Sequence, residues 1–516
     1  MPMPIPRWLE RLIRGAVDFL CVQMAGILAL AFSASYVAKS QIPEVELSHY
    51  YFRTFLPLSL VFPLVYALTG LYTKLRGYAL AHKLRRAALG ASIATLLLIF
   101  VSFLANRVLL PRSAAVIFAL LVIAAAVGVR WLKDWLFHSE AVDTPIASPQ
   151  TVVSTGDAVL VVGGAGYIGS IVVSKLLDRG YSVRLLDRLV YGDQSIAPLL
   201  THPKLEFISG DCRNISDVVG AMNGAKSVIH LAAIVGDPAC AADDENAYQI
   251  NYSATRMILE IARGAGIQRF IFASSCSVYG ASESLMDEKS ETVPISLYAE
   301  TKLQSEQVLL EAASRDFHPT ILRFATVFGL APRPRFDLVV NLLTAKAIQD
   351  GVITIYNGSQ WRPFVHVRDI AEAVVQVLAA PVESVSGEIF NVGDDRLNFT
   401  LAELAEKIRT QIPQTRIEYV ENSDRRNYRV SFQKIRNCIG FTTQHTVESG
   451  IAEIKRAFEL GEIHDYRRPF YSNVSFLKER GRVHPKNDLD VKVMAAFADG
   501  GGSFEILKAR AASSSN

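Results

Sequence analysis

The chain has few cysteines and no marked excess of charge, and both shortages exclude common classes of protein. Its five cysteines are scattered, odd in number and never in a CxxC or Cys/His spacing, so neither a disulfide framework nor a zinc site is indicated. The 53 basic and 50 acidic residues nearly balance, which argues against a nucleic-acid partner. We therefore expect no metal site, no nucleic acid and a reducing compartment.

Charged residues are also scarce as a whole. They make up 20% of the chain, against 50% hydrophobic residues, and the mean hydropathy is positive. This balance is unusual for a wholly soluble protein. The length of 516 residues is too great for one ordinary core. We expect several structural units, one of them in a membrane.

Four apolar runs near the N-terminus carry the membrane signal. A transmembrane helix needs about 20 apolar residues, and runs of roughly this length occupy 19–38, 54–73, 87–105 and 113–130. Four such runs in series favour an all-α bundle of four transmembrane helices over 1–137, rather than buried globular helices or a cleaved signal peptide. Pro57 and Pro63 predict a kink in the second run.

Lysine and arginine near these runs predict the orientation. If both termini are cytoplasmic, the inner flanks hold Arg7, Arg11, Arg14, Lys74, Arg76, Lys83, Arg85, Arg86, Arg130 and Lys133, and the outer loops hold Lys39, Arg53, Arg107 and Arg112. Cytoplasmic loops carry the excess of basic residues. We therefore expect a multi-pass protein of a bacterial inner membrane, with the bilayer as a partner and both termini in the cytoplasm.

A linker and a second domain follow. Residues 138–156 are rich in Ser, Thr and Pro and lack helical periodicity, which is typical of a linker. From Ala158 onward, short β-branched runs alternate with amphipathic stretches. This alternation predicts an α/β domain over 157–478, with a doubly wound parallel sheet of the Rossmann type and a smaller C-terminal substrate-binding part. Residues 479–516 show no convincing pattern, and we expect a largely disordered tail.

A glycine-rich segment marks a candidate cofactor site. The sequence VLVVGGAGYIGS begins at Val159 and contains both the GxGxxG and the GxxGxxG spacing. Such glycines allow a tight turn and let the backbone approach a pyrophosphate, while the following helix N-terminus supplies N–H groups. The predicted cofactor-binding residues of this loop are Gly163, Gly164, Gly166, Tyr167, Ile168 and Gly169.

The end of the next predicted strand distinguishes the two nicotinamide dinucleotides. Asp187 lies there, 18 residues after Gly169. A carboxylate at this place accepts hydrogen bonds from the adenosine ribose and repels a 2′-phosphate, so we expect NAD. Arg188 follows Asp187, and an arginine here could bind the 2′-phosphate of NADP, so NADP is the alternative.

With these motifs the chain resembles the extended short-chain dehydrogenase/reductase family, especially its nucleotide-sugar epimerases and dehydratases, over about 158–478. Further marks are GDCRN at 210–214, HLAA at 230–233, Asn251 with Thr255, SSCSVYG at 274–280 and YAETK at 298–302. The resemblance implies contacts of Asp211 and neighbouring Cys212 with the adenine end of the cofactor. It also implies that Asn251 and the backbone of Leu231, Ala232 and Ala233 line the cofactor site.

Ser275, Tyr298 and Lys302 are the predicted catalytic residues. Tyr298 and Lys302 are four apart on a predicted helix and share one face. When a hydride leaves a sugar carbon the hydroxyl proton must leave too, and a phenol of pKa about 10 is a weak base at neutral pH. A nearby ammonium lowers that pKa, and Ser275 can orient the phenolic oxygen. Both helix residues are also expected to contact the cofactor.

The residue before Val278 bears on the reaction type. Related dehydratases and decarboxylases have Glu there and certain 3,5-epimerases have a catalytic Cys nearby, whereas this chain has Ser277. Cys276 is displaced by one position, and we expect a small packed residue. The remaining chemistry is hydride shuttling at one carbon, that is, 4-epimerisation through a transient 4-keto sugar.

The substrate side is predicted from two basic segments. WRPFVHVRD at 361–369 resembles the RDxxHVxD segment of the family, in which the arginine binds a nucleotide diphosphate, so Arg362 is a candidate. DRRNY at 424–428 resembles a second phosphate clamp, with Arg425 or Arg426 as its cation. Thr326 replaces an asparagine of the family motif LRxxN and is counted with the substrate-binding residues. The expected ligand is a nucleotide sugar.

Two other functions stay open. One is an NAD-dependent nucleotide-sugar oxidoreductase or dehydratase, and the other is a non-catalytic NAD-binding membrane scaffold. The four predicted spans resemble those of membrane-anchored bacterial polysaccharide-biosynthesis proteins, which implies a place in glycan precursor synthesis. A homodimer is left open.

Overall fold

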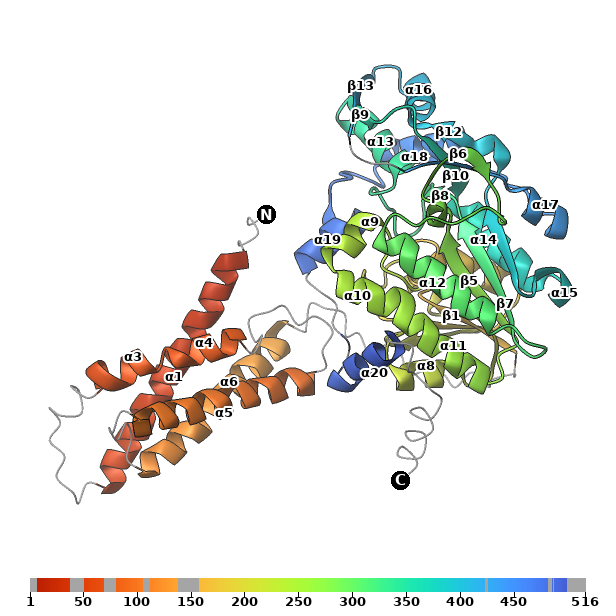
Figure 1. Ribbon diagram of the computed structural model, residues 1–516. Helices are drawn as coiled ribbons and strands as arrows, with labels where there is room; N and C mark the ends of the chain where they lie inside the picture. The colour runs from red at the N-terminus through yellow and green to blue at the C-terminus, as the bar shows by residue number, and fades with distance from the viewer. Residues whose placement is uncertain are drawn as a thin grey trace. The chain divides into compact units, whose positions relative to one another are not determined.

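The computed structural model describes residues 7–37, 51–68, 80–104, 112–137, 157–422, 426–480, 485 and 487–498. The chain divides into two units, Met1–Ile146 and Ala147–Asn516. Their boundary falls within the predicted linker 138–156, which lies outside the described residues. Figure 1 shows a helical N-terminal unit and an α/β unit.

Long apolar helices form the N-terminal unit: α1 (Arg7–Val37), α5 (Leu80–Leu104) and α6 (Arg112–Phe137). Between α1 and α5 lie η1 (Tyr51–Phe55), α3 (Leu56–Leu58) and α4 (Val61–Leu68). The helical path is broken between α3 and α4, at Ser59 and Leu60, next to Pro57 and Pro63. The kink predicted in this run is confirmed, because a proline removes a helical N–H donor.

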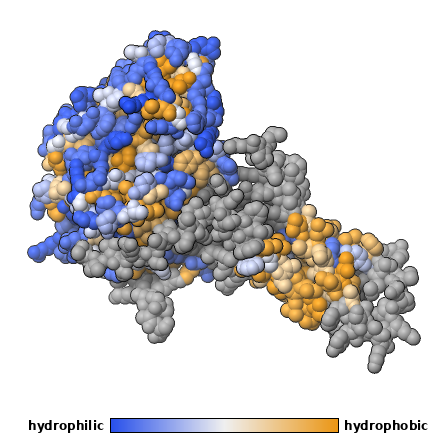
Figure 2. Space-filling model, turned by 180° about the vertical axis from the view of Figure 1, so that it is seen from behind, coloured by the Kyte–Doolittle hydropathy of each residue, from blue (hydrophilic) through white to orange (hydrophobic). Residues whose placement is uncertain are grey.

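Paired polar side chains lie among these apolar helices. The Arg130 guanidinium of α6 donates to both Asp18 oxygens of α1, at 2.9 and 2.8 Å. Gln23 of α1 donates to Ser59 Oγ at 2.6 Å. The outer surface is different: large hydrophobic side chains are exposed there, and Figure 2 shows mainly hydrophobic residues over the described part of this unit. Charges are thus paired inside, while apolar groups face outward.

One described helix is long and apolar enough to cross a bilayer, over Ala115–Leu132. The other apolar helical stretches are shorter: Gly15–Ala31, Leu56–Leu68 and Ala87–Val101. Among the described residues, the structure therefore supports one candidate span where the sequence predicts four. The C-terminal ends of the first three predicted runs lie outside the described ranges.

The α/β unit is built on a seven-stranded sheet with the order β11-β7-β5-β4-β1-β2-β3. All its strand pairs are parallel. The strands are β1 (Ala158–Val162), β2 (Val183–Asp187), β3 (Leu205–Ser209), β4 (Ala225–His230), β5 (Arg269–Ser275), β7 (His318–Phe324) and β11 (Glu388–Val392). The order reverses between β1 and β4, and ligands of such sheets bind at the carboxyl ends beside this point. The predicted parallel Rossmann sheet is confirmed.

Helices cover both faces of the sheet. One face packs against α7 (Gly169–Asp178) and α14 (Val367–Ala379). The other packs against α8 (Ile215–Met222), α11 (Ala254–Gly264) and α12 (Leu297–Glu311). Because both faces of β1 are buried, its sequence AVLVV is apolar throughout.

A smaller part lies beyond the carboxyl ends of the strands (Figure 1). Its strands are β6 (Ala281–Met286), β8 (Thr326–Phe328), β9 (Val352–Tyr356), β10 (Trp361–His366), β12 (Asn398–Thr400), β13 (Arg416–Val420) and β14 (Asn427–Val430). Its main helices are α13 (Val339–Gln349), α16 (Leu401–Gln411) and α18 (Val447–Glu459), which share a separate hydrophobic core. This part is present where the sequence predicts the C-terminal substrate-binding region.

Short elements complete the α/β unit. They are η3 (Ala197–Leu199), α9 (Asp237–Ala242), α10 (Asp244–Tyr248), η4 (Gln249–Ser253), η5 (Cys276–Tyr279), α15 (Val382–Val385), η6 (Asp395–Leu397), α17 (Gln433–Ile439), η7 (Pro469–Tyr471) and α19 (Asn473–Arg480).

The prediction of a disordered tail over 479–516 is wrong for part of that range. Residues Asp488–Ala498 form helix α20, which buries Val493, Met494 and Phe497 in the core beside α8 and α11. The Asn214 amide also donates to both Asp490 carboxylate oxygens, at 3.0 and 3.1 Å. The helix has only 11 residues, with apolar residues along most of its length rather than on one face, so the sequence shows no clear helical period and packing on the core stabilises it. Residues 499–516 lie outside the described part.

Candidate active site

Strand β1 runs into the glycine-rich loop, and α7 begins at its end. Gly163 has φ +86°, and a Cβ there would lie 2.5 Å from the Ala232 nitrogen. A Cβ on Gly169 would lie 2.5 Å from Gly164 Cα, inside the turn. Beside Gly166, by contrast, only the Gly163 oxygen lies within 4 Å, at 3.4 Å. Within the described part of the chain, no side chain lies within 4 Å of a Cβ at Gly166, and a pyrophosphate at the start of α7 requires such a space.

The two larger residues of the loop point away from that space. The buried Tyr167 hydroxyl donates to the Gly329 carbonyl at 2.6 Å. Ile168 packs against the core between the sheet and α7. Their side chains anchor the loop, so any contact with a cofactor would come from their backbone.

Asp187 closes the glycine-rich loop against the end of β2. Its two carboxylate oxygens accept from Ala165 N at 2.9 Å and from Leu189 N at 2.8 Å. Burial raises the pKa of the Asp187 carboxyl although these N–H groups oppose the shift. The predicted place at the ribose edge fits, but backbone donors already occupy both oxygens.

Asp211 is surrounded by guanidinium groups. Arg213 donates to its two oxygens at 3.1 and 2.9 Å, and Arg188 forms an ion pair with it. Burial works against ionisation, but the two arginines hold the pKa of Asp211 below its usual range. Arg188 is thus engaged by a carboxylate, which weakens the case for NADP. Burial raises the pKa of the adjacent Cys212 thiol to about 12, so it is an inert neighbour.

The segment after β4 lies against the glycine-rich loop. Leu231 N and Ala232 N both donate to the Val162 carbonyl at 2.9 Å. Asn251 accepts from Ile234 N at 2.8 Å and donates to Ile234 O at 3.0 Å. Asn251 therefore holds the backbone beyond Ala233 in place, and this is a positioning role.

The predicted catalytic residues come together where β5 ends and α12 begins. Ser275 is the last residue of β5, and its Oγ accepts from Ser277 Oγ at 2.9 Å. Burial raises the pKa of the Tyr298 phenol, and a hydrogen bond with Ser275 opposes that shift. Lys302 Nζ lies 5.9 Å from the Tyr298 ring centroid. Serine, phenol and ammonium are therefore neighbours, as the sequence predicts.

The Lys302 ammonium, predicted to contact the cofactor, forms a hydrogen bond to the sheet backbone. Its ammonium donates to the Ala273 carbonyl of β5 at 2.7 Å and lies 4.7 Å from the centroid of the Phe272 ring. Burial lowers the pKa of Lys302 to about 8. The cation therefore lies next to the phenol, but its hydrogen bond goes to the backbone of the sheet.

This lowered pKa predicts how Lys302 affects stability in the absence of cofactor. The pKa of an unfolded lysine is about 10.4. Between that value and the folded value of about 8, the unfolded chain binds more protons, so the contribution of Lys302 to stability rises with pH. We expect the unfolding free energy of the wild type, relative to Lys302→Met, to increase between about pH 8 and 10. Urea unfolding of both proteins across this range would measure it, and a constant difference would contradict the prediction.

Helix α12 is positioned at both ends by polar contacts. At its start, the N-cap Ser296 accepts from Ala299 N at 3.3 Å and donates to Asp237 Oδ1 at 2.7 Å. Further along, the buried Glu306 accepts from Arg323 Nη2 of β7 at 2.6 Å and from the Ser274 hydroxyl of β5. These contacts fix the helix face that carries Tyr298 and Lys302.

The structure brings two of the predicted substrate residues together. Arg362 on β10 is 8% exposed, and its Nη1 donates to the Arg426 carbonyl at 2.5 Å. The Arg426 side chain forms an ion pair with Asp237 at 2.9 Å. Thr326 lies on β8, the strand beside Arg362, paired with Phe364. Arg425 lies outside the described residues.

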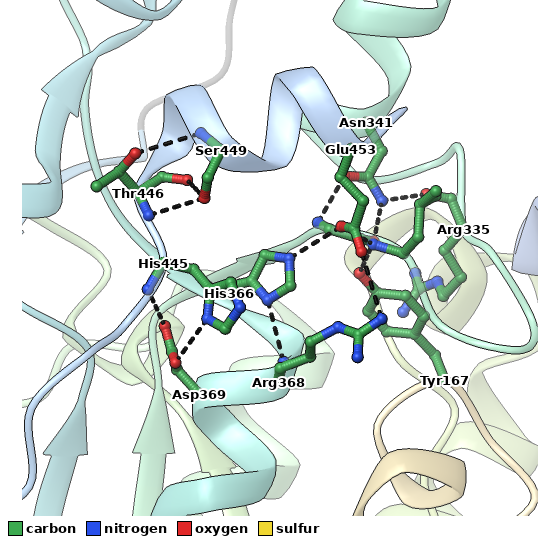
Figure 3. Close-up of polar contacts among 12 residues, drawn as sticks. Tyr167, Arg335, Asn341, His366, Arg368, Asp369, His445, Thr446, Ser449 and Glu453 are labelled. Carbon is green, nitrogen blue, oxygen red and sulfur yellow. Dashed lines mark hydrogen bonds and ion pairs between the residues drawn. The ribbon is translucent and has the colours of Figure 1, made fainter. Parts of the chain in front are cut away.

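His366 and Asp369 belong to a structural network, shown in Figure 3. The His366 ring stacks on His445 with centroids 4.2 Å apart, and His366 Nε2 lies 3.1 Å from Glu453 Oε2. Asp369 Oδ1 lies 2.9 Å from His445 Nδ1, and Glu453 accepts from Leu330 N at 2.9 Å. This network ties α14 to α18 and to the loop after β8, so these side chains organise the segment around β10.

Sequence reasoning missed Asp237, Glu306 and Arg323. Asp237 joins the start of α12 to Arg426, and the only sequence signal for it was the Asp-Pro pair of GDPAC, typical of a helix start. Glu306 lies four residues after Lys302, the spacing of the same helix face, which could have indicated it.

Cys276 is buried, with its thiol directed at the Arg323 carbonyl at 3.3 Å, which confirms the prediction of a packed residue.

Comparisons with known proteins agree with this fold and site. The family model described as "NAD dependent epimerase/dehydratase family" matches residues 159–393. The uncharacterized UDP-glucose epimerase YtcB of Bacillus subtilis is 31% identical over 245 residues, which are 46% of this chain and 76% of that protein. The UDP-glucose 4-epimerase of Lactobacillus helveticus is 29% identical over 271 residues, 48% of this chain and 81% of the relative.

A solved structure is also similar to this chain. MoeE5, in complex with UDP-glucuronic acid and NAD, is 28% identical with a TM-score of 0.52, and the match covers 59% of this chain and 99% of that one. Sequence, fold and the arrangement of Ser275, Tyr298 and Lys302 thus lead to one assignment. The chain belongs to the NAD dependent epimerase/dehydratase family.

Proposed function

We propose that this protein is an NAD-dependent nucleotide-sugar epimerase that inverts C4 through a transient 4-keto sugar. The observation that carries the proposal is the meeting of Ser275, Tyr298 and Lys302 at the carboxyl end of the sheet, on the strand next to β4 at the switch point. Relatives named UDP-glucose 4-epimerase support the same reaction.

The residues present fit a bound dinucleotide. The loop is uncovered at Gly166 and closely packed at Gly163 and Gly169, as a pyrophosphate site requires. We assign the cofactor backbone contacts to this loop and to Leu231, Ala232 and Ala233, and the ribose edge to Asp187. When bound, NAD supplies a hydride acceptor that can return the hydride to the sugar.

The chain's own residues move the proton. Tyr298 takes the proton of the C4 hydroxyl as the C4–H bond breaks. After the 4-keto sugar has rotated to present its other face, Tyr298 returns this proton to the C4 oxygen. Ser275, whose hydroxyl lowers the pKa of the Tyr298 phenol, orients the same oxygen. Lys302 supplies a neighbouring positive charge that stabilises the phenolate once it forms. No proton or hydride is consumed overall.

Ser277 favours epimerisation over elimination. Its hydroxyl donates to Ser275 Oγ at 2.9 Å and offers no carboxylate for a second proton transfer. An oxidoreductase that releases the keto sugar is the remaining catalytic alternative. It would accumulate NADH, whereas an epimerase regenerates NAD in each cycle.

The decisive experiment incubates the purified full-length protein with UDP-, GDP- and dTDP-sugars and follows the products by NMR, with NADH absorbance recorded in parallel. A C4 epimer without net NADH is the expected result. Stoichiometric NADH with a keto sugar would replace the epimerase by the oxidoreductase. No turnover of any sugar would favour the non-catalytic scaffold.

We assign Arg362 to the diphosphate of the substrate. Arg426 lies beside it, and Arg425 lies outside the described residues. We expect Arg362→Ala to raise KM for the identified nucleotide sugar by about 30-fold or more, because truncating a buried charge contact costs on the order of 2–5 kcal/mol. Arg362→Lys is the control, since it keeps the charge but loses the two-pronged donor. An unchanged KM in Arg362→Ala would remove this residue from the substrate site.

We further propose that the N-terminal unit anchors the enzyme as four transmembrane helices in a bacterial inner membrane, with both termini cytoplasmic. The apolar outer surface and the paired Asp18 and Arg130 support a lipid surrounding. Reporter fusions after residues 45 and 129 would test this. Cytoplasmic activity at 129 and periplasmic activity at 45 are expected, and the reverse pattern would reject the orientation. The membrane anchor would keep the enzyme near the site of glycan precursor synthesis. Assembly into a homodimer is a separate proposal.

A further inference from the structure

Two buried arginines lie in the segment between β8 and α13. Arg333 is 2% exposed and Arg335 is 7% exposed. Arg335 has an ordinary structural explanation: its Nε and Nη2 donate to the two oxygens of Asp337, at 2.9 and 3.1 Å. Asp337 also accepts from Asn473 N at 2.9 Å. The only acidic side chain of this segment is therefore fully used by other donors.

Arg333 has no carboxylate partner among the described residues. Its Nη2 donates to the Phe470 carbonyl at 3.2 Å, and its Nε is buried with no hydrogen-bond partner. The guanidinium lies on the Tyr191 ring, 3.8 Å from the centroid, and 5.7 Å from that of Phe470. Burial lowers the pKa of Arg333 to about 10. A buried cation held only by two rings and one carbonyl is incompletely compensated, because charged groups are costly to bury unpaired.

The position of Arg333 points to the missing partner. Tyr191 follows β2, and in the same segment Ser195 Oγ donates to the Ala165 carbonyl of the glycine-rich loop at 2.7 Å. The Arg335 guanidinium lies 5.9 Å from the centroid of Tyr167, another residue of that loop, and Figure 3 shows the two side chains next to each other. Segments on both sides of Arg333 thus contact the loop from which α7 begins.

The acidic groups around Arg333 already have other hydrogen-bond donors. Asp187 is the nearby acidic group on the loop side, and backbone N–H groups take both its oxygens. The N-terminus of α7 adds partial positive charge. Arg188, on the other side of Tyr191 in the chain, also has a buried nitrogen atom, Nη2, without a partner. Arg333 and Arg188 are the only arginines of which this is true within the described ranges.

We propose that Arg333 binds the pyrophosphate of the dinucleotide cofactor, opposite the backbone N–H groups at the start of α7. The ligand is an anion with several oxygens, which suits a guanidinium because two N–H groups can donate in parallel. Tyr191 holds the guanidinium flat for this contact. The inference rests on the proposed function only in taking the cofactor to be NAD.

The test measures binding rather than turnover. The full-length protein, freed of cofactor, is titrated calorimetrically with NAD and with ADP-ribose, which has the same pyrophosphate but no nicotinamide. Loss of a charge-assisted contact predicts about 10- to 100-fold weaker binding of both ligands to Arg333→Met. Arg333→Lys should lie between this variant and the wild type. Arg396→Met removes an exposed arginine paired with Asp394 and is the matched control, with unchanged affinity.

Each result decides the proposal. Unchanged affinity of Arg333→Met for NAD and ADP-ribose would overturn it. UDP is titrated in parallel, and weaker UDP binding at unchanged NAD affinity would also overturn the proposal and place Arg333 at the substrate diphosphate. If Arg333→Met does not fold by circular dichroism, Arg333→Lys decides: weaker binding of NAD and ADP-ribose with an unchanged unfolding midpoint is expected, and wild-type affinity would overturn the proposal. A wild-type protein that binds no NAD would instead contradict the proposed function.

Discussion

Replacing Tyr298 by phenylalanine is expected to abolish turnover while leaving the fold and NAD binding nearly intact. The substitution removes the phenolic oxygen and keeps the ring that lies beside Lys302. General acid/base catalysis contributes about 100- to 10,000-fold, which sets the expected loss in kcat. Because the ring and its packing remain, KM and unfolding free energy should change little.

Steady-state kinetics with the identified nucleotide sugar would measure this loss. Ser275→Ala is the milder variant for comparison, because the phenol remains and water can replace the lost hydroxyl. Its kcat should fall less than that of Tyr298→Phe. Near wild-type epimerisation by Tyr298→Phe would leave the family assignment in place but reject Tyr298 as the proton acceptor.

The largest expected effect on stability is that of Glu306→Ala. Glu306 is 1% exposed and receives three hydrogen bonds from Arg323 at 2.6 to 3.2 Å, besides that from Ser274. Arg323, itself 3% exposed, would be left buried and without its carboxylate. Removing one partner of a buried ion pair costs about 3–5 kcal/mol. We therefore expect a much lower unfolding midpoint in urea, and lower activity because α12 carries Tyr298 and Lys302.

Two further variants distinguish the ion pair from simple cavity formation. Glu306→Gln keeps the size of the side chain and loses the charge, so it should also be destabilised. The double variant Glu306→Leu with Arg323→Met removes both charges and should recover much of the loss, because apolar replacement of a buried pair is often near neutral. Equal destabilisation of the double variant and Glu306→Ala would show that packing, rather than an uncompensated Arg323, is the cause.

The parts of the site that could be predicted from the sequence are those in which short segments act alone. The glycine-rich loop is defined by residues 163–169 between one strand and one helix, and the turn itself requires glycine at Gly163, where φ is +86°. Tyr298 and Lys302 share a face because they are four apart on α12. Alternation of buried strands and amphipathic helices likewise predicts the parallel sheet.

Contacts between distant segments could not be predicted in this way. Asp237 and Arg426 are 189 residues apart, yet their ion pair connects the predicted phosphate-binding region to the start of α12. The last 38 residues show no convincing sequence pattern, whereas α20 lies on the core through three apolar side chains. In the N-terminal unit, hydropathy alone predicts four spans, while the described helices have one stretch of sufficient length.

The sequence by itself determined β1, the glycine-rich loop and α7. It also determined that Tyr298 and Lys302 share one face of α12. Spacing along a single element is enough for these, since backbone periodicity sets which side chains are neighbours. Only the tertiary structure decided the partners of buried charges: Glu306 pairs with Arg323, Asp337 pairs with Arg335, and Arg333 has no carboxylate partner among the residues that the structure describes. The physical reason is that a buried charge must be compensated by whatever the packed fold brings within a few ångströms, and chain distance carries no information about that.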